Sequence, residues 1–162
     1  MAATVDVVEF ELGGERYALD IQLAREIVEM IPITPIPRAP PFISGVINLR
    51  GEITNIINLN TLLGLPNRDI RENQKIIVLV PEAAGGSNIG VIVDDVSSVT
   101  QVSDTDVESM GEGFASEFSS FVKGIIKVRG DDAEKTDKSE KKSKGLIIWI
   151  DMQKVLKDLA NK

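Results

Sequence analysis

A strand-like segment occurs twice in this chain, and its second copy carries an insertion. Residues 45–52 (GVINLRGE) match residues 124–131 (GIIKVRGD), since each is a glycine, an apolar run, an arginine, a glycine and an acid. When residues 132–145 are skipped, residues 53–63 match residues 146–156 without a gap, and Asn58 aligns with Asp151. Asn and Asp are favoured helix N-caps. Each copy therefore predicts two strands, a turn between them and a capped helix, which favours two similar β-lobes over one continuous sheet.

Short runs rich in Val and Ile, separated by turn residues, recur along the chain, and this pattern is typical of barrels and sandwiches. A turn at Gly13 and Gly14 predicts a hairpin between the first two strands. Alternation along the first strand predicts that Val8, Phe10 and Leu12 face the core. The expected strands are residues 5–12, 16–19, 27–31, 45–49, 53–57, 75–80, 89–93, 96–102, 122–128 and 146–150.

Three other segments have distinct patterns. Residues 151–160 predict a helix, because apolar side chains recur there at helical spacing, whereas residues 24–28 are ambiguous. Residues 32–41 hold five of the seven prolines, which predicts a stiff extended connection. Residues 131–145 carry five acids and five lysines but no large apolar side chain, so we expect a flexible charged insertion. It is either a tolerated loop or a docking arm.

The chain has 162 residues, which is long enough for two small lobes that share a core. We expect a single domain over residues 4–160. Its first barrel would lie approximately at residues 15–66, its second at residues 67–150, and its terminal helix at residues 151–160.

The composition excludes several classes of function. The chain has no Cys and no His, which removes disulfides, thiolate chemistry, the usual general base and the commonest metal ligand. A net charge of −7 and few aromatic residues disfavour nucleic-acid binding. The apolar runs are far shorter than the ~20 residues that cross a bilayer, and the start alternates like a strand instead of a signal peptide. We therefore expect a cytoplasmic protein without direct membrane insertion.

No catalytic constellation is evident. Asp94 and Asp95 are adjacent acids, which point to opposite faces if they lie on a strand and are usually solvated if they lie on a loop. Serines such as Ser97 and Ser98 have no histidine to activate them. We therefore expect no enzymatic activity, no cofactor and no bound metal.

Arg50 stands at a tight turn between two predicted strands, where Gly51 permits a positive φ. Its guanidinium can pair with a carboxylate in a fixed geometry. It can staple its own strand end to a nearby acid, or present an arginine to a partner, and these two roles are compatible.

The same region resembles a known family. Residues 26–27, the proline-rich linker, residues 42–51 (FISGVINLRG) and residues 56–59 (IINL) closely resemble CheW, the chemotaxis coupling family. Residues 90–96 (GVIVDDV) resemble a segment of its second half, and the resemblance extends over residues 5–159. It implies an all-β fold of two five-stranded SH3-like barrels packed together, with an apolar groove between them, short helices and a C-terminal helix.

The resemblance also implies a non-enzymatic adaptor. Members of the family couple the cytoplasmic tip of chemoreceptors (methyl-accepting chemotaxis proteins) to the regulatory domain of the histidine kinase CheA, at membrane-bound receptor clusters. Kinase contact is expected at barrel edges, with no residue assigned. Ala24 is smaller than the branched residue expected at its position, and an ion pair is expected between Glu26 and Arg50. The receptor-coupling positions implied are Ala24, Glu26, Gly45, Arg50 and Gly51.

Two alternatives differ from this interpretation. A CheV-like or CheA-derived regulatory module would share the motifs, but the short chain without a kinase core, its start and its capped terminal helix favour a stand-alone coupler. A barrel that binds single-stranded nucleic acid is disfavoured by the acidic charge and the scarcity of aromatic residues.

Overall fold

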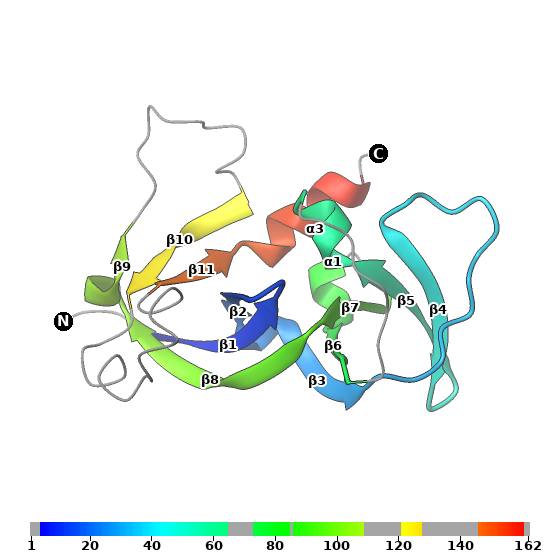
Figure 1. Cartoon of the computed structure of the whole chain (residues 1–162), viewed down its shortest axis with the longest axis horizontal. Coiled ribbons are helices and arrows are strands. Elements are labelled where there is room, and N and C mark those ends of the chain that lie inside the picture. The colour runs from blue at the N-terminus through cyan, green and yellow to red at the C-terminus, as the bar shows by residue number, and fades with distance from the viewer. Residues whose placement is uncertain (1–3, 65–72, 85, 109–120, 128–145, 161–162) are drawn as a thin grey trace.

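The computed structural model describes residues 4–64, 73–84, 86–108, 121–127 and 146–160, and its strands form two sheets (Figure 1). Sheet A has the order β8 (Asp95–Ser103), β1 (Thr4–Leu12), β2 (Glu15–Asp20), β11 (Leu146–Ile150), β10 (Val122–Lys127) and β9 (Val107–Glu108). Sheet B has the order β3 (Ala24–Glu29), β6 (Lys75–Leu79), β7 (Ile89–Val93), β5 (Glu52–Asn58) and β4 (Ile43–Leu49).

The helices are few and short. Among the described residues, the α-helices are α1 (Leu59–Leu62) and α3 (Met152–Ala160), and the 3-10 helices are η1 (Ile21–Leu23), η2 (Pro81–Ala84) and η3 (Asp104–Asp106). We call sheet A with α3 lobe A, and sheet B with α1 lobe B. The predicted all-β fold with two SH3-like subdomains is confirmed, although the sheets have six and five strands and neither ladder closes among the described residues.

The predicted strands are all present, and the ambiguous residues 24–28 belong to β3. The short strand β9 was not predicted, because two residues are too few to show a pattern. Leu12 lies opposite Glu15 across the predicted hairpin turn, where Gly13 and Gly14 both have positive φ. The expected insertion at residues 131–145 lies outside the described residues.

The two sheets have the same topology. In sheet A, β8, β1 and β2 are antiparallel neighbours, β2 is parallel to β11, and β11 is antiparallel to β10. Sheet B repeats this arrangement with β3, β6, β7, β5 and β4. The hairpin β1–β2 at the start of the chain therefore occupies in lobe A the place that β6–β7 occupies in lobe B.

This arrangement divides the strands differently from the expected lobes at residues 15–66 and 67–150. Strand β2 lies in sheet A, whereas β6 and β7 lie in sheet B. The repeat in the sequence covers only the segments from β4 to α1 and from β10 to α3. It therefore contains no information on which sheet the remaining strands join.

The two aligned caps have the same geometry. The side chain of Asn58 accepts a hydrogen bond from the Thr61 N–H at 3.3 Å, and Oδ1 of Asp151 accepts one from the Lys154 N–H at 3.1 Å. Each satisfies an amide in the first turn of a helix, which has no intrahelical partner. The predicted caps are therefore confirmed.

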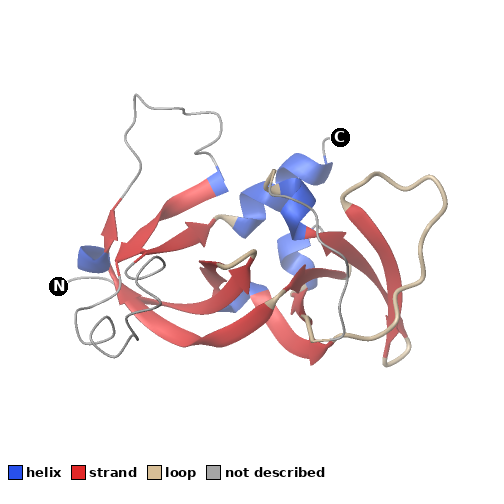
Figure 2. Ribbon diagram, in the orientation of Figure 1, coloured by secondary structure: helices blue, strands red, loops and turns tan. Residues whose placement is uncertain are grey.

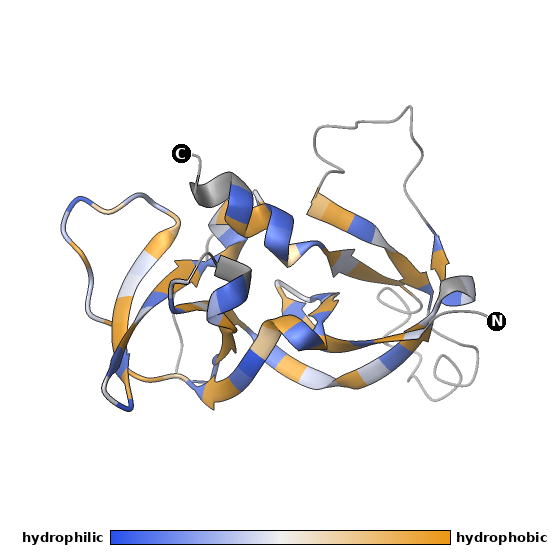
Figure 3. Ribbon diagram, turned by 180° about the vertical axis from the view of Figure 1, so that it is seen from behind, coloured by the Kyte–Doolittle hydropathy of each residue, from blue (hydrophilic) through white to orange (hydrophobic). Residues whose placement is uncertain are grey.

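The core has three parts. A central core draws side chains from both sheets and both α-helices, which lie together between the two groups of strands (Figure 2). Lobe A also encloses a small core around Val7 and Trp149, and lobe B one around Ile56 and Ile76. Val8, Phe10 and Leu12 face the central core as predicted. Both faces of β1 are thus buried from Val7 to Phe10. Hydrophobic and hydrophilic residues alternate along many of the strands (Figure 3).

The proline-rich connection passes over β4 at Gly45. Thr34 and Val46 exchange two backbone hydrogen bonds, each of 2.9 Å. Gly45 has a φ of 146°, and a Cβ atom there would lie 2.3 Å from the carbonyl oxygen of Thr34. In lobe A, a Cβ on the aligned Gly124 would lie 2.5 Å from Cγ1 of Val107 in β9. The two aligned glycines therefore admit the same kind of crossing.

We expect Gly45→Ala to lower the free energy of unfolding by about 3 kcal/mol, because it combines the strain of positive φ with displacement of the Thr34 backbone. Gly51→Ala is the matched control. Its φ is 90°, but no atom lies within 4 Å of its Cβ position, so strain alone should cost about 1–2 kcal/mol. Urea unfolding followed by the fluorescence of Trp149 measures both changes. Equal losses would contradict the close crossing at Gly45.

Candidate functional site

Strands β4 and β5 are joined by a two-residue turn, Arg50 and Gly51, with Leu49 opposite Glu52. Arg50 has a φ of 51° and Gly51 a φ of 90°, and positive φ at both central residues is the signature of a type I′ turn. Oδ1 of Asn48 accepts the Gly51 N–H at 2.8 Å. Glycine adopts this conformation freely, but an arginine in it costs about 1 kcal/mol or more. Arg50 is therefore held at the turn against its backbone preference.

The turn carries a cluster of four charged side chains. Nη2 of Arg50 donates a hydrogen bond to Oε2 of Glu26 on β3, so the expected ion pair is present. Arg25 lies with Nε 3.8 Å from Oε2 of Glu26 and with Nη1 3.4 Å from Oε1 of Glu52. We call Arg25, Glu26, Arg50 and Glu52 the charge cluster.

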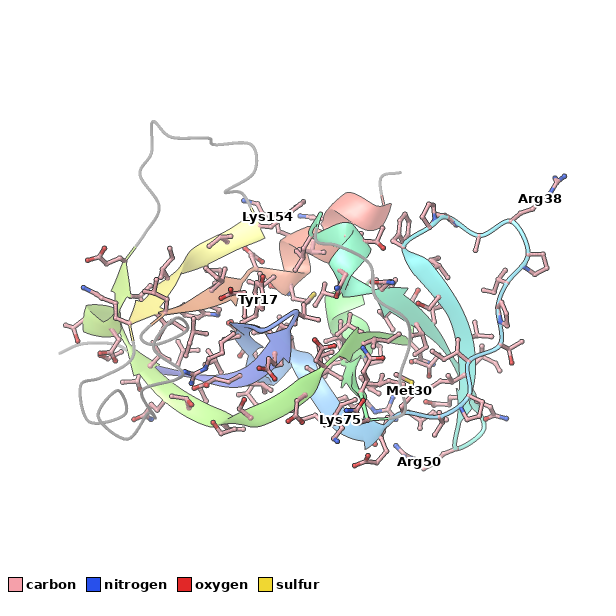
Figure 4. All side chains as sticks on the ribbon, in the orientation of Figure 1. Tyr17, Met30, Arg38, Arg50, Lys75 and Lys154 are labelled. Atoms are coloured by element: carbon pink, nitrogen blue, oxygen red, sulfur yellow. The ribbon has the colours of Figure 1, made fainter. Side chains whose placement is uncertain are left out.

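The charge cluster joins the two ends of sheet B. Strand β3 is one edge of this sheet and β4 is the other, so the pair between Glu26 and Arg50 spans a gap that no ladder closes. The side chain of Glu26 is 24% exposed and that of Arg50 is 62% exposed. Arg50 is labelled at the lower edge of lobe B in Figure 4. Arg50 therefore holds the two sheet edges together while most of its side chain remains exposed to the solvent.

A β-bulge in β3 directs the side chains of Arg25 and Glu26 toward the Arg50–Gly51 turn. Ala24 lies opposite Leu79 and Glu26 opposite Val78, so Arg25 is the extra residue between them. Bulges bend a strand and redirect its side chains.

Strand β8 of lobe A has the same irregularity, and its register puts Ser98 where β3 has Glu26. The residue aligned with Arg50 is Arg129, which lies outside the described residues. The carboxylate of the charge cluster is thus specific to lobe B.

The structure brings together only some of the predicted site residues. Glu26, Arg50 and Gly51 meet in the charge cluster. Ala24 packs against the central core instead. Gly45 lies farther back along β4, roughly 16 Å from Arg50 at about 3.3 Å per residue. Arg25 and Glu52 were not predicted, although Arg25 precedes Glu26 and Glu52 is two residues after Arg50, each with the opposite charge.

An apolar border was also missed. Ile27 on β3 is 42% exposed and Val99 on β8 is 55% exposed. Ile27 lies opposite Ile77 and Val99 opposite Val8, and both partners are buried in the central core. Residues opposite each other in antiparallel strands project from the same face of the sheet. The apolar surface of the central core therefore continues to the solvent at an edge strand of each lobe.

A polar pocket lies among the described residues where the two lobes meet. Its volume is about 440 Å³ and its lining is acidic. Asp94 is engaged there in structural bonds, since it accepts the Gly13 N–H at 2.8 Å and the Gln74 Nε2 at 3.0 Å. No group of three metal-binding side chains occurs within the described residues. The lining residues are Glu11, Gly14, Asn73, Lys75, Asp94 and Asp95.

Two side chains away from the charge cluster have shifted pKa values. Burial raises the pKa of the Tyr17 hydroxyl, and the carboxylate of Glu15 raises it further. A hydrogen bond from Lys127, 2.9 Å long, lowers the pKa of the exposed Glu108. Tyr17 therefore stays protonated and Glu108 ionised near neutral pH, so neither shift prepares a group for acid–base catalysis there.

In the part of the chain that the structure describes, none of the helices has the length and apolar character needed to cross a membrane.

Comparison with known proteins gives one consistent result. The model of the CheW-like domain family matches residues 6–160. The chemotaxis protein CheW of Rhizobium meliloti (strain 1021) is 32% identical over 126 residues, which are 77% of this chain and 79% of that protein. CheW of Thermotoga maritima is 26% identical over 97% of this chain and 91% of its own length.

A solved structure agrees with these matches. The scaffolding protein TtCheW from Thermoanaerobacter tengcongensis superposes with a TM-score of 0.70 at 31% sequence identity. The similarity covers 91% of this chain and 84% of that one. The shared domain, the relatives and the common fold show that this chain belongs to the CheW-like family of chemotaxis scaffolding proteins, which are not enzymes.

Proposed function

We propose that this chain is an adaptor that couples chemoreceptors to the regulatory domain of the histidine kinase CheA. Membership of a chemotaxis scaffolding family supports this function. The observation that carries it is the charge cluster, where a strained arginine is fixed by Glu26 but remains mostly exposed. The adaptor works in the cytoplasm, requires no cofactor and is recruited to membrane-bound receptor clusters through its partners.

The receptor-coupling surface lies along the edge strand β3, where Glu26 of the charge cluster and Ile27 of the apolar border project from opposite faces of the sheet edge. Arg50 offers a guanidinium for carboxylates or backbone carbonyls, and Ile27 on the same strand as Glu26 offers apolar area. An interface of this kind has apolar contacts that provide affinity and charges that fix the orientation. Affinity for the receptor should therefore depend mainly on apolar contact.

The other three predicted site residues have little or no side chain to offer a partner. They support the surface by holding the backbone in position. Gly51 allows the turn that positions Arg50. Gly45 lets the Thr34 segment cross β4, which fixes the strand leading to the turn. Ala24 anchors β3 to the central core just before the bulge. All three therefore act by holding Glu26 and Arg50 in place.

The charge swap at Glu26 and Arg50 tests this function. Arg50→Glu should change the free energy of unfolding by no more than about 1 kcal/mol, because the pair is substantially exposed. Receptor-dependent control of CheA autophosphorylation should nevertheless be lost, since two carboxylates now repel each other and displace the turn. The double variant Glu26→Arg with Arg50→Glu restores opposite charges and should recover part of the control. The readouts are kinase activity with receptor and the unfolding midpoint.

Lys127→Glu is the matched control, because it breaks an exposed ion pair with Glu108 in lobe A. This variant should regulate the kinase normally. Normal regulation by Arg50→Glu would remove the charge cluster from the site. An unfolded Arg50→Glu variant would instead show that the charge cluster serves only to stabilise the fold.

A further inference from the structure

A second arginine is held in a strained conformation, at the opposite end of lobe B. The Ala39 N–H donates to the carbonyl oxygen of Ile36 at 3.2 Å, which closes a turn with Pro37 and Arg38 at its centre. Arg38 has a φ of 64°. Proline followed by a residue with positive φ is the signature of a type II turn, whose third position favours Gly or Asn. An arginine at this position is therefore unfavourable for the backbone.

The turn is nonetheless firmly held. Thr34 is hydrogen-bonded to Val46 on one side of it, and the Ile43 N–H donates to Pro40 at 3.0 Å on the other. The Asn58 N–H donates to Phe42 at 2.7 Å, and five prolines restrict the segment. A loop with so little freedom loses little entropy when a partner binds.

Arg38 makes no ion pair or hydrogen bond through its side chain within the described residues, and it points away from the body of the protein (Figure 4). Its strain is thus not offset by a contact inside this chain. Strained residues that the fold itself does not require are often found where a protein contacts a partner. Ile36, in the same turn, is 39% exposed and adds an apolar side chain to the tip.

The position of this turn matters for an adaptor. Arg38 and Arg50 lie at opposite ends of lobe B (Figure 4), so a partner docked on the charge cluster leaves the proline-rich turn accessible. The chain has a net charge of −7, which repels an acidic partner over most of the surface. An arginine on a rigid tip supplies a local site where a carboxylate can bind.

We propose that residues 36–39 form the docking point for the second partner, on a protein surface that presents a carboxylate beside an apolar side chain. The proposal rests on the proposed function, in which the charge cluster receives the receptor and this second partner is the regulatory domain of CheA. Arg38 pairs with the carboxylate, and Ile36 covers the apolar side chain. The proline-rich segment then holds the Arg38 and Ile36 side chains in fixed positions relative to each other.

The test measures binding of the full chain to the CheA regulatory domain and, separately, to a receptor cytoplasmic fragment. Arg38→Asn should weaken binding to the CheA domain by about tenfold, and Arg38→Glu should weaken it further. Binding to the receptor fragment should not change. The thermal midpoint of Arg38→Asn should equal or exceed that of the wild type, because Asn tolerates positive φ. Lys157→Glu, an exposed charge reversal on α3, is the control and should bind both partners normally.

The outcomes separate the two proposals. If the wild type binds neither partner, the proposed function fails and this docking point fails with it. If the wild type binds both and the Arg38 variants bind the CheA domain equally well, the docking point alone is overturned. A loss of receptor binding instead, an equal loss in Lys157→Glu, or a lower thermal midpoint in Arg38→Asn would also overturn it.

Discussion

The central core is the feature on which the rest of the structure depends. It holds side chains from both sheets and both α-helices, whereas each lobe's own core is small. Full burial of one large apolar side chain contributes about 1.5–3 kcal/mol, so most of the apolar stabilisation lies between the lobes. The chain also crosses between them twice, at η1 and at Asp94. The lobes therefore stabilise each other, which fixes the position of the charge cluster relative to the apolar border.

The two lobes share one topology but place their charged groups differently. In lobe A, Trp149 Nε1 donates to Asp20 at 2.7 Å, and Lys123 Nζ lies 3.0 Å from the same carboxylate and 4.8 Å from the indole ring. These polar groups bind one another inside the lobe. In lobe B, the residue aligned with Trp149 is Ile56, and the charged groups lie at the solvent-exposed turn instead. The two lobes thus differ in where their charged groups lie, although their topology is the same.

The sequence predicted what depends on local pattern. Alternating Val and Ile gave the strands, the Arg50–Gly51 dipeptide gave the turn, and Asn58 and Asp151 gave the caps. The position of β1–β2 in lobe A could not be predicted, because strand pairing across the chain leaves no local signal. The same holds for Arg38, whose positive φ comes from a turn that prolines and a crossing strand impose. Ile27 and Val99 were missed because exposure at a sheet edge depends on which strands pair.

The central claim is that one small protein holds a receptor and a kinase at the same time on separate surfaces. Sedimentation of the chain with a receptor cytoplasmic fragment and the CheA regulatory domain tests it most directly. We expect a single ternary complex, with the affinity for either partner unchanged or increased when the other is present. Two binary complexes that exclude each other, so that one partner displaces the other, would contradict this account.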